Sequence, residues 1–284
     1  MGKPNAIVKK GQEQKLPVVP AAAPIDFSAD AGSGMEGADA QSFAIPFLSV
    51  LQKGSPQVDE ASGVAIEGAR QGMFFNSVTG RMYDGKSGLI IVPAAYQRRF
   101  VRWAPRETGG GFKGELTADQ AAQLRAAGAV VEVDGRLFFP DEAGNVNPKR
   151  SDRLADVRNH FCVMVDPNTG EFSNVLISLT STQIKKSKTL MSMLASVKLK
   201  RGDGSLYTPP TYSQQIRVTS TPEQNDQGSW FGVRFESEGL VTDVLLYEAA
   251  KAFHATVISG AAQATYSAPE GGTPAAAASQ APGF

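Results

Sequence analysis

Apolar and polar residues along the chain follow the pattern of a protein built mainly from β-strands. Apolar runs or alternations of strand length recur between turn signals. The predicted strands are 88–94 (GLIIVPA), which we expect Pro93 to end, 96–103 (YQRRFVRW), 160–165 (HFCVMV), 173–179 (SNVLISL), 214–220 (QQIRVTS) and 230–236 (WFGVRFE), with Asp134-Gly135 marking a further hairpin between AVVEV and RLFF. Many short strands with few helices favour a closed barrel or a sandwich.

Helical periodicity is confined to a few segments. They are 42–52, 117–128, 181–197 and 242–259. The clearest is the second, where Thr117 can cap the first turn, Gln120 stands at the capping-box position and Gly128 can end the helix. In the first, apolar residues recur at helical spacing, but Pro46 limits the segment to a short or broken helix.

Composition divides the chain into three parts. Residues 1–40 are rich in Ala, Gly and Pro and have little periodicity, so we expect a disordered N-terminal arm. Residues 261–284 carry one charge, Glu270, and are expected to be a disordered Ala/Pro/Gly tail. Residues 41–260 hold nearly all the aromatic residues and are predicted to form the folded domain.

The charge balance excludes a protein that is basic overall, because 28 Lys and Arg meet 28 Asp and Glu in 284 residues. Cys162 is the single cysteine, so there is no disulfide framework, and with only His160 and His254 beside it a Cys/His zinc site is excluded. No apolar run reaches the roughly 18 residues of a membrane helix. No GxSxG, HExxH or CxxC pattern occurs. We therefore expect a cytoplasmic protein without membrane contact, metal, cofactor or enzymatic activity.

Two segments nevertheless concentrate positive charge. Seven basic residues meet two acidic ones between residues 81 and 113, and 185–201 holds six basic residues and no acidic one. Such stretches can attract phosphates at short range while the whole molecule stays neutral. A basic run alone is more often a solvated surface than a binding site, so the residue types beside it are needed to distinguish the two.

Aromatic residues alternate with arginines in the first cationic segment. On a strand, Arg98, Phe100 and Arg102 share one face, whereas Arg99, Val101 and Trp103 share the other. Because both faces carry cations, we expect neither to lie deep in a core. Arginine that neutralises phosphates beside rings that stack on unpaired bases is typical of single-strand binding. The alternative is that Trp103 is a half-buried packing residue.

Two further segments add to this hypothesis. The outward face of the last predicted hairpin is expected to present Arg217, Trp230 and Arg234 together, unless a loop or helix covers Trp230. In 181–197, Lys185 and Lys188 share a helix face among Ser and Thr, which also bind phosphate oxygens. The predicted nucleic-acid-binding residues are Arg98, Arg99, Arg102, Trp103, Arg106, Phe112, Lys113, Lys185, Lys186, Lys188, Arg217, Trp230 and Arg234.

Four successive stretches resemble tailed-phage single-stranded DNA-binding proteins of the replication and recombination region. They are IPFLSVLQKGSPQV, GLIIVPAAYQRRFVRWAPRETGGGF, NVLISLTSTQIKKSKTLMSML and GSWFGVRF, and the resemblance covers roughly residues 43–258. It implies an elaborated OB-fold barrel, single-stranded DNA as the ligand and no chemistry on that DNA. It also implies phage replication or recombination proteins as partners, recruited through an acidic tail with a terminal aromatic. This chain ends in Phe284, but its tail carries only Glu270.

Two functions from other classes stay open at this point. A neutral, β-rich chain with Ala/Pro tails also suits a phage structural or assembly protein. The same cationic face also suits a module that binds another protein. The oligomeric state, including a homo-oligomer, is left open by the sequence, as is the preference between DNA and RNA.

Overall fold

The computed structural model describes residues 27–226 and 228–266 of the chain. Residues 1–39 and 40–284 form separate units. In the first unit the described residues form turns around one short 3-10 helix, η1 (Ser28–Asp30). The predicted arm and tail therefore lie largely outside the described residues.

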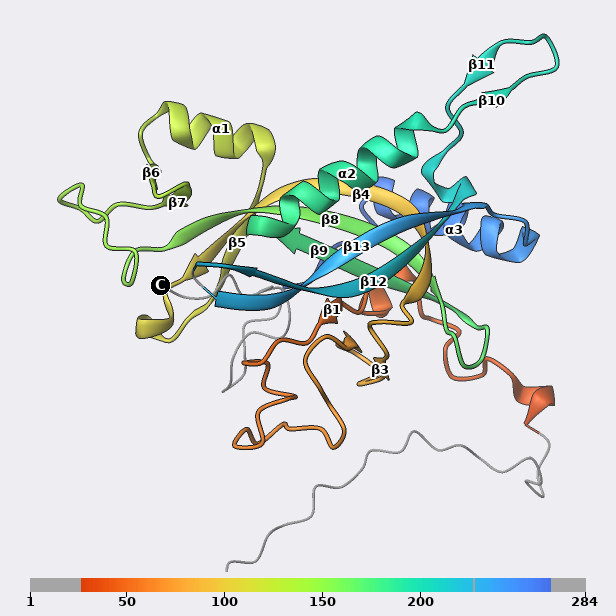
Figure 1. Cartoon of the computed structure of the whole chain (residues 1–284), viewed down its shortest axis with the longest axis horizontal. Helices are drawn as coiled ribbons and strands as arrows, with labels where there is room; N and C mark the ends of the chain where they lie inside the picture. Colours follow the sequence, from red (N-terminus) through yellow and green to blue (C-terminus); the bar gives the residue numbers. More distant parts are fainter. Residues whose placement is uncertain (1–26, 227, 267–284) are drawn as a thin grey trace, which may run out of the picture. The chain divides into compact units, whose positions relative to one another are not determined.

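The second unit is mainly β-structure (Figure 1). Its main sheet contains β4 (Leu89–Ala104), β5 (Gly111–Thr117), β6 (Val131–Val133), β7 (Arg136–Phe138), β8 (Arg153–Val165), β9 (Phe172–Thr180), β12 (Gln214–Asn225) and β13 (Gly228–Leu240). Smaller sheets are formed by β1 (Leu48–Val50), β2 (Phe74–Asn76) and β3 (Met82–Tyr83), and by β10 (Leu199–Lys200) and β11 (Leu206–Tyr207). The α-helices are α1 (Ala118–Ala126), α2 (Ile184–Ser196) and α3 (Val244–Ile258), and short 3-10 helices are η2 (Ala40–Ser42), η3 (Arg106–Thr108), η4 (Ser181–Gln183) and η5 (Thr211–Ser213).

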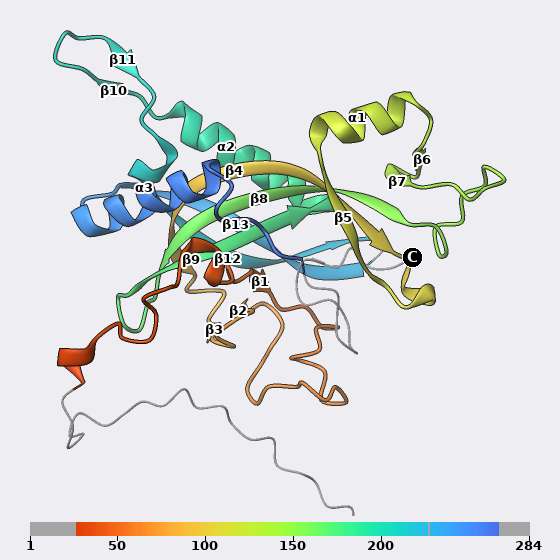
Figure 2. The ribbon, with the colours of Figure 1, turned by 180° about the vertical axis from the view of Figure 1, so that it is seen from behind.

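The central path of the sheet is β13-β12-β4-β8-β9, and every pair along it is antiparallel. Numbered in chain order from β4, the path reads 5-4-1-2-3, which is the strand order of an OB-type Greek-key barrel. Helix α2 stands between the third and fourth of these strands. The sheet curls strongly, as Figures 1 and 2 show, and forms a half-barrel. The prediction of a mainly β, OB-like fold with inserted helices is confirmed.

The inside of the half-barrel is a hydrophobic core to which all strands of the path contribute. Inward side chains include Ile91, Cys162, Ile177, Ile216 and Phe235. Helix α2 packs onto the same core with Leu190 and Leu194, which are buried. Each fully buried aliphatic side chain contributes about 1.5–3 kcal/mol relative to an exposed one. This core fixes α2 against the half-barrel.

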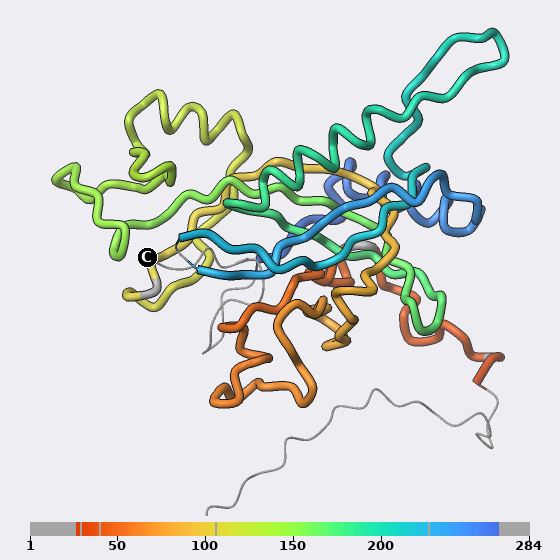
Figure 3. The backbone as a smooth tube through the Cα atoms, in the orientation of Figure 1, coloured from red at the N-terminus to blue at the C-terminus, as the bar shows by residue number. Residues whose placement is uncertain are grey.

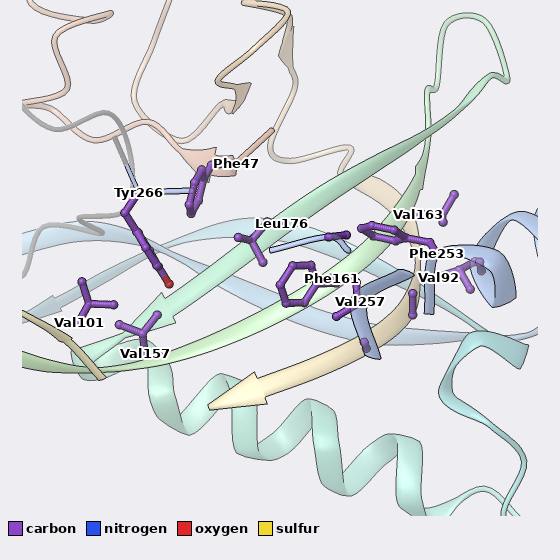
Figure 4. Close-up of a cluster of buried hydrophobic side chains, with 14 of the residues drawn as sticks. Phe47, Val92, Val101, Val157, Phe161, Val163, Leu176, Phe253, Val257 and Tyr266 are labelled. Carbon is purple, nitrogen blue, oxygen red and sulfur yellow. The ribbon is translucent and has the colours of Figure 1, made fainter. Parts of the chain in front are cut away.

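Helix α3 covers one part of the outer face of β4, β8 and β9. Phe161 and Val163 of β8 belong to the same buried cluster as Phe253 and Val257 of α3 (Figure 4). Because the strands are covered on both faces here, 161–165 is an uninterrupted apolar run rather than an alternation.

A second part of that outer face is covered by the segment that follows α3. Ala262 is 5% exposed and Tyr266 is 6% exposed, and both belong to the outer core with Val101 and Val157. Figure 4 shows the Tyr266 ring beside Phe47, with its hydroxyl pointing toward the strands. The predicted boundary at residue 260 is therefore wrong, since the folded region extends at least to 266.

The long connection between β4 and β8, residues 105–152, forms a lobe outside the half-barrel (Figure 3). The predicted capping box is present, because the Thr117 side chain accepts from the Gln120 N–H and the Gln120 side chain accepts from the Thr117 N–H. The predicted hairpin turn is also present, with positive φ at Asp134 (49°) and Gly135 (70°).

Where the half-barrel stays open, between β9 and β13, side-chain amides replace a strand. Gln52 donates to the Phe231 carbonyl at 2.9 Å and accepts from the Phe231 N–H at 2.8 Å. The Gln183 side chain accepts from the Val233 N–H at 3.0 Å. These bonds satisfy backbone groups of β13 that a closed barrel would pair with another strand.

Two secondary-structure predictions are wrong. Segments 88–94 and 96–103 form one strand, because Pro93 lies at a β-bulge, where the missing N–H of proline is tolerated. Segment 42–52 contains β1 rather than a helix. Phe47 bridges to β9, and this tertiary pairing outweighs the helical spacing of the apolar residues.

Candidate nucleic-acid interface

The two predicted cationic segments lie at one end of the half-barrel. Thr180, the last residue of β9, pairs with Val157, which in turn pairs with Arg99 near the end of β4. Just after Thr180, Lys186 at the start of α2 forms a 2.7 Å ion pair with Glu223, near the end of β12. The end of β4, the start of α2 and the β12–β13 turn are thus gathered together (Figures 1 and 3).

The predicted division of faces on β4 is correct. Arg98, Phe100 and Arg102 point to one side, whereas Arg99, Val101 and Trp103 point to the other. The inference that neither face lies in a core is wrong. Phe100 packs against α1 in a third buried cluster, and Val101 is fully buried in the outer core. Strand β4 can carry buried side chains on both faces because its arginine side chains, beside those buried positions, are exposed to solvent or form ion pairs.

One group of cations surrounds Asp156 on β8. Arg98 and Arg158 both bind this carboxylate, at 2.8 Å and 2.9 Å. Arg158 also donates to the Tyr96 hydroxyl at 2.9 Å. Two guanidinium groups on one carboxylate leave this group with a net charge of about +1.

A second group likewise combines two cations with one carboxylate. Arg102 and Lys113 both bind Asp152, at 2.6 Å and 3.0 Å. The Arg102 guanidinium also lies 3.9 Å from the centre of the Phe139 ring, a cation–π contact. Asp152 is buried while both cations are partly exposed, so the surplus positive charge faces solvent.

The other predicted cations with a described ion pair are matched one to one by carboxylates. The pairs are Arg99–Glu115 (2.8 Å), Lys186–Glu223 (2.7 Å), Arg217–Glu238 (2.6 Å) and Arg234–Glu236 (2.8 Å). Burial raises the pKa of Glu115 above its ordinary value, and the charge of Arg99 opposes this shift. A phosphate would have to compete with these carboxylates. The sequence analysis did not foresee this pairing.

Lys185 and Lys188 differ from the rest. Both are exposed on α2, and neither has an ion-pair partner within the described part of the chain. Their ammonium groups can therefore meet a phosphate without displacing a carboxylate of the described residues. The side chain of Arg106 lies outside the described residues.

Trp230 is half-buried and fixed by a hydrogen bond. The strand register places it on one face with Arg217 and Arg234, as predicted. Its Nε1–H donates to Glu223 at 3.0 Å, and the same carboxylate accepts from Gln183 at 3.1 Å. Burial raises the pKa of Glu223, but the hydrogen bonds from Lys186, Gln183 and Trp230 outweigh it and hold that pKa below its ordinary value. Trp230 is therefore a positioned side chain rather than a free platform.

Trp103 and Phe112 lie together in an aromatic cluster on the outer face. Their ring centroids are 6.0 Å apart in an edge-on arrangement. Sequence reasoning missed the other two members, Phe47 and Tyr266. The available signal was the isolated aromatic residue at 266 in an otherwise small-residue segment. Phe112 and Lys113 lie on β5, which begins at Gly111, so these two residues are held by a strand.

Two glycine patterns that sequence reasoning missed lie close to the cationic segment. GRMYDGKS (80–87) has the GxxxxGK[ST] spacing, and GGGFKG (109–114) has the GxGxxG spacing. Both patterns require a helix after the loop, whereas these run into β4 and β5. A Cβ at Gly85 would also clash with the Gly72 carbonyl. Neither loop is a phosphate-binding loop of these classes.

Other kinds of site are not formed by the described residues. They contain no cluster of three or more His, Cys, Asp or Glu side chains with the spacing of metal ligands. No helix among residues 27–226 and 228–266 is long and apolar enough to cross a membrane. Cys162 is fully buried, and burial raises the pKa of its thiol, as expected of a structural cysteine.

Comparison with known proteins identifies a family. No curated protein and no solved structure matches the chain. The family model described as Pam3 phage gp34-like protein matches residues 10–263, which include the half-barrel, the lobe and α3. The chain is therefore a phage protein and belongs to the Pam3 phage gp34-like protein family.

Proposed function

We propose that this phage protein binds single-stranded DNA during replication or recombination and carries out no chemistry on it. One observation carries the proposal. Surplus cations on one face of β4 and an aromatic cluster on its other face both lie at the end of an OB-type half-barrel from which the β4–β8 and β12–β13 connections emerge. OB-folds bind oligonucleotides with their second and third strands and with these two connections.

The charge distribution supports a strand of phosphates as the ligand. Asp152 and Asp156 each neutralise one of two bound cations, and Lys185 and Lys188 add charge on α2. A flexible single strand can reach cations on several elements, whereas a straight duplex hides its base faces from the rings. The proposal therefore includes a preference for single strands over duplex.

Fluorescence anisotropy of a labelled oligonucleotide tests this function. We expect binding that weakens with salt and is stronger for the single strand than for its duplex. The double variant Lys185→Ala/Lys188→Ala should lower the slope of log affinity against log salt by about 1.4, because each phosphate contact of a single strand contributes about 0.7.

Lys251→Ala/Lys86→Ala is the matched control, since it removes the same charge from α3 and from the exposed turn before β4, at the other end of that strand. It should leave the slope nearly unchanged. Equal affinity for duplex and single strand at moderate salt, or equal slopes for the two double variants, would contradict the proposal.

A further inference from the structure

A tyrosine ring occupies a ring-sized site on the outer face of the half-barrel. Tyr266 stacks on Phe112, with ring centroids 5.5 Å apart and planes inclined by 23°. Trp103 meets it edge-on at 6.0 Å, and Phe47 closes the other side at 5.6 Å. The Tyr266 hydroxyl accepts a hydrogen bond from Asn159 Nδ2 at 2.8 Å. Aromatic walls with an amide at the bottom define this site.

The bottom of the site offers more hydrogen bonding than the tyrosine uses. Asn159 on β8 is completely buried, yet its Oδ1 has no partner in the described part of the structure. The residue opposite on β9 is Ser178. Burial raises the pKa of the Tyr266 hydroxyl, and an interaction with the buried Oγ of Ser178 opposes this shift. Buried polar groups are normally satisfied. A ligand with a hydrogen-bond donor beside an acceptor would satisfy both the Oδ1 and the Nδ2 of Asn159, whereas the tyrosine hydroxyl is bonded only to Nδ2.

Tyr266 is held by its ring rather than by its backbone. Ala262 donates to the Thr256 carbonyl at 3.0 Å, but residues 263–266 make no backbone hydrogen bond to other described residues. Gln263 and Thr265 are exposed. The tyrosine can therefore leave the site without breaking a helix or a strand ladder.

We propose that this site binds an unpaired nucleobase and that Tyr266 is its occupant in the free protein. This inference rests on the proposed function. A base is a flat ring that can stack on Phe112, and its edge offers the adjacent donor and acceptor that an asparagine amide pairs with in bidentate fashion. Glu115 and its ion-pair partner Arg99 both act electrostatically on the Tyr266 hydroxyl, so a charged pair stands near the position that the base would take.

Occupancy by Tyr266 lowers the apparent affinity for DNA. When only a fraction of molecules has the site open, the measured dissociation constant equals the intrinsic one divided by that fraction. Removing the ring should therefore tighten binding. Tyr266→Ala should bind a deoxythymidine oligonucleotide about tenfold more tightly than the parent. An abasic oligonucleotide of the same length has the same phosphates but no base, and should show no such gain.

A measurement on the unaltered full chain gives an independent readout. The NMR resonances of the Tyr266 ring should shift when the thymidine oligonucleotide binds, because the ring leaves the aromatic side chains that surround it. They should stay unchanged with the abasic oligonucleotide. Tyr266→Phe, which keeps the ring but loses the bond to Asn159, should tighten binding by about twofold to fivefold. This variant keeps the packing and therefore covers the case in which Tyr266→Ala does not fold.

The outcomes separate the two proposals. Absence of oligonucleotide binding by the parent and both variants at low salt would overturn the proposed function. Binding by the parent, with no gain in Tyr266→Phe and no shift of the Tyr266 ring resonances, would overturn the nucleobase site alone. An equal gain with the abasic oligonucleotide would also overturn it, since the gain would then not come from a base.

Discussion

Acidification from pH 7 to pH 5 should destabilise the fold through one buried histidine. His160 is fully buried, with Nε2 2.8 Å from Ser187 Oγ and the rings of Tyr96 and Phe235 at 5.1 Å and 6.4 Å. Burial, with a smaller contribution from the charge of Arg158, lowers the pKa of His160 from 6.5 to about 3. A protonated ring would be a charge in the core without a carboxylate partner.

The sign and size of the effect follow from proton linkage. Below about pH 6.5 the unfolded chain takes up a proton at this histidine, whereas the folded protein does not until the pH approaches 3. The stability that the neutral His160 contributes is therefore fully present above the pKa of this histidine in the unfolded chain, and it is lost as the pH falls below that value. Each pH unit corresponds to about 1.4 kcal/mol, so the loss between pH 7 and pH 5 is about 2 kcal/mol.

Urea unfolding at the two pH values measures this loss. The variant His160→Gln is expected to be less stable at pH 7 but to lose about 2 kcal/mol less on acidification than the parent. The matched variant His254→Gln, on the partly buried face of α3, should keep the loss seen in the parent. The same pH dependence in the parent and in His160→Gln would refute the reasoning.

Two further predictions concern the packing of the interface. Gly232→Ala should destabilise the fold by about 1–2 kcal/mol, because the new Cβ would lie 2.6 Å from the Glu223 carboxyl carbon, and it should also alter the fluorescence of Trp230, which donates to Glu223. Chemical unfolding of the double variant Gly232→Ala/Glu223→Ala should show that part of this loss of stability is restored. Trp103→Ala should cost about 2 kcal/mol of stability, less than the 3–5 kcal/mol of a fully buried tryptophan, because Trp103 is half-buried; an unchanged melting temperature would contradict its packing against the outer core.

Much of the half-barrel could be predicted from local sequence. The alternation in β12 and β13 follows directly from one buried and one solvated face, and the apolar runs in β8 and β9 follow from burial on both faces. The capping box at Thr117 and the turn at Asp134-Gly135 depend on near neighbours only. Pro93 misled the strand prediction because whether a bulge tolerates proline depends on the partner strand, which the local pattern does not contain.

The site was less predictable because its determinants are distant in sequence. The positions of Arg98 and Arg102 on one face follow from strand periodicity. Their carboxylate partners stand 58 and 50 residues away, with Asp156 on β8 and Asp152 just before it, so the pattern could not show that these carboxylates bind the cations. Tyr266 was hidden for the same reason. Its contacts with Phe112 and Asn159 come from the folded arrangement alone.

The glutamine bridges along β13 have a consequence for how the protein behaves at high concentration. A half-barrel exposes the edge of a sheet, and an unpaired edge can capture a strand of another molecule and start aggregation. Gln52 occupies both backbone groups of Phe231, and Gln183 occupies the N–H of Val233. An incoming strand would find these hydrogen-bonding positions already taken. The sheet can thus stay open toward a ligand while resisting edge-to-edge association with its own copies.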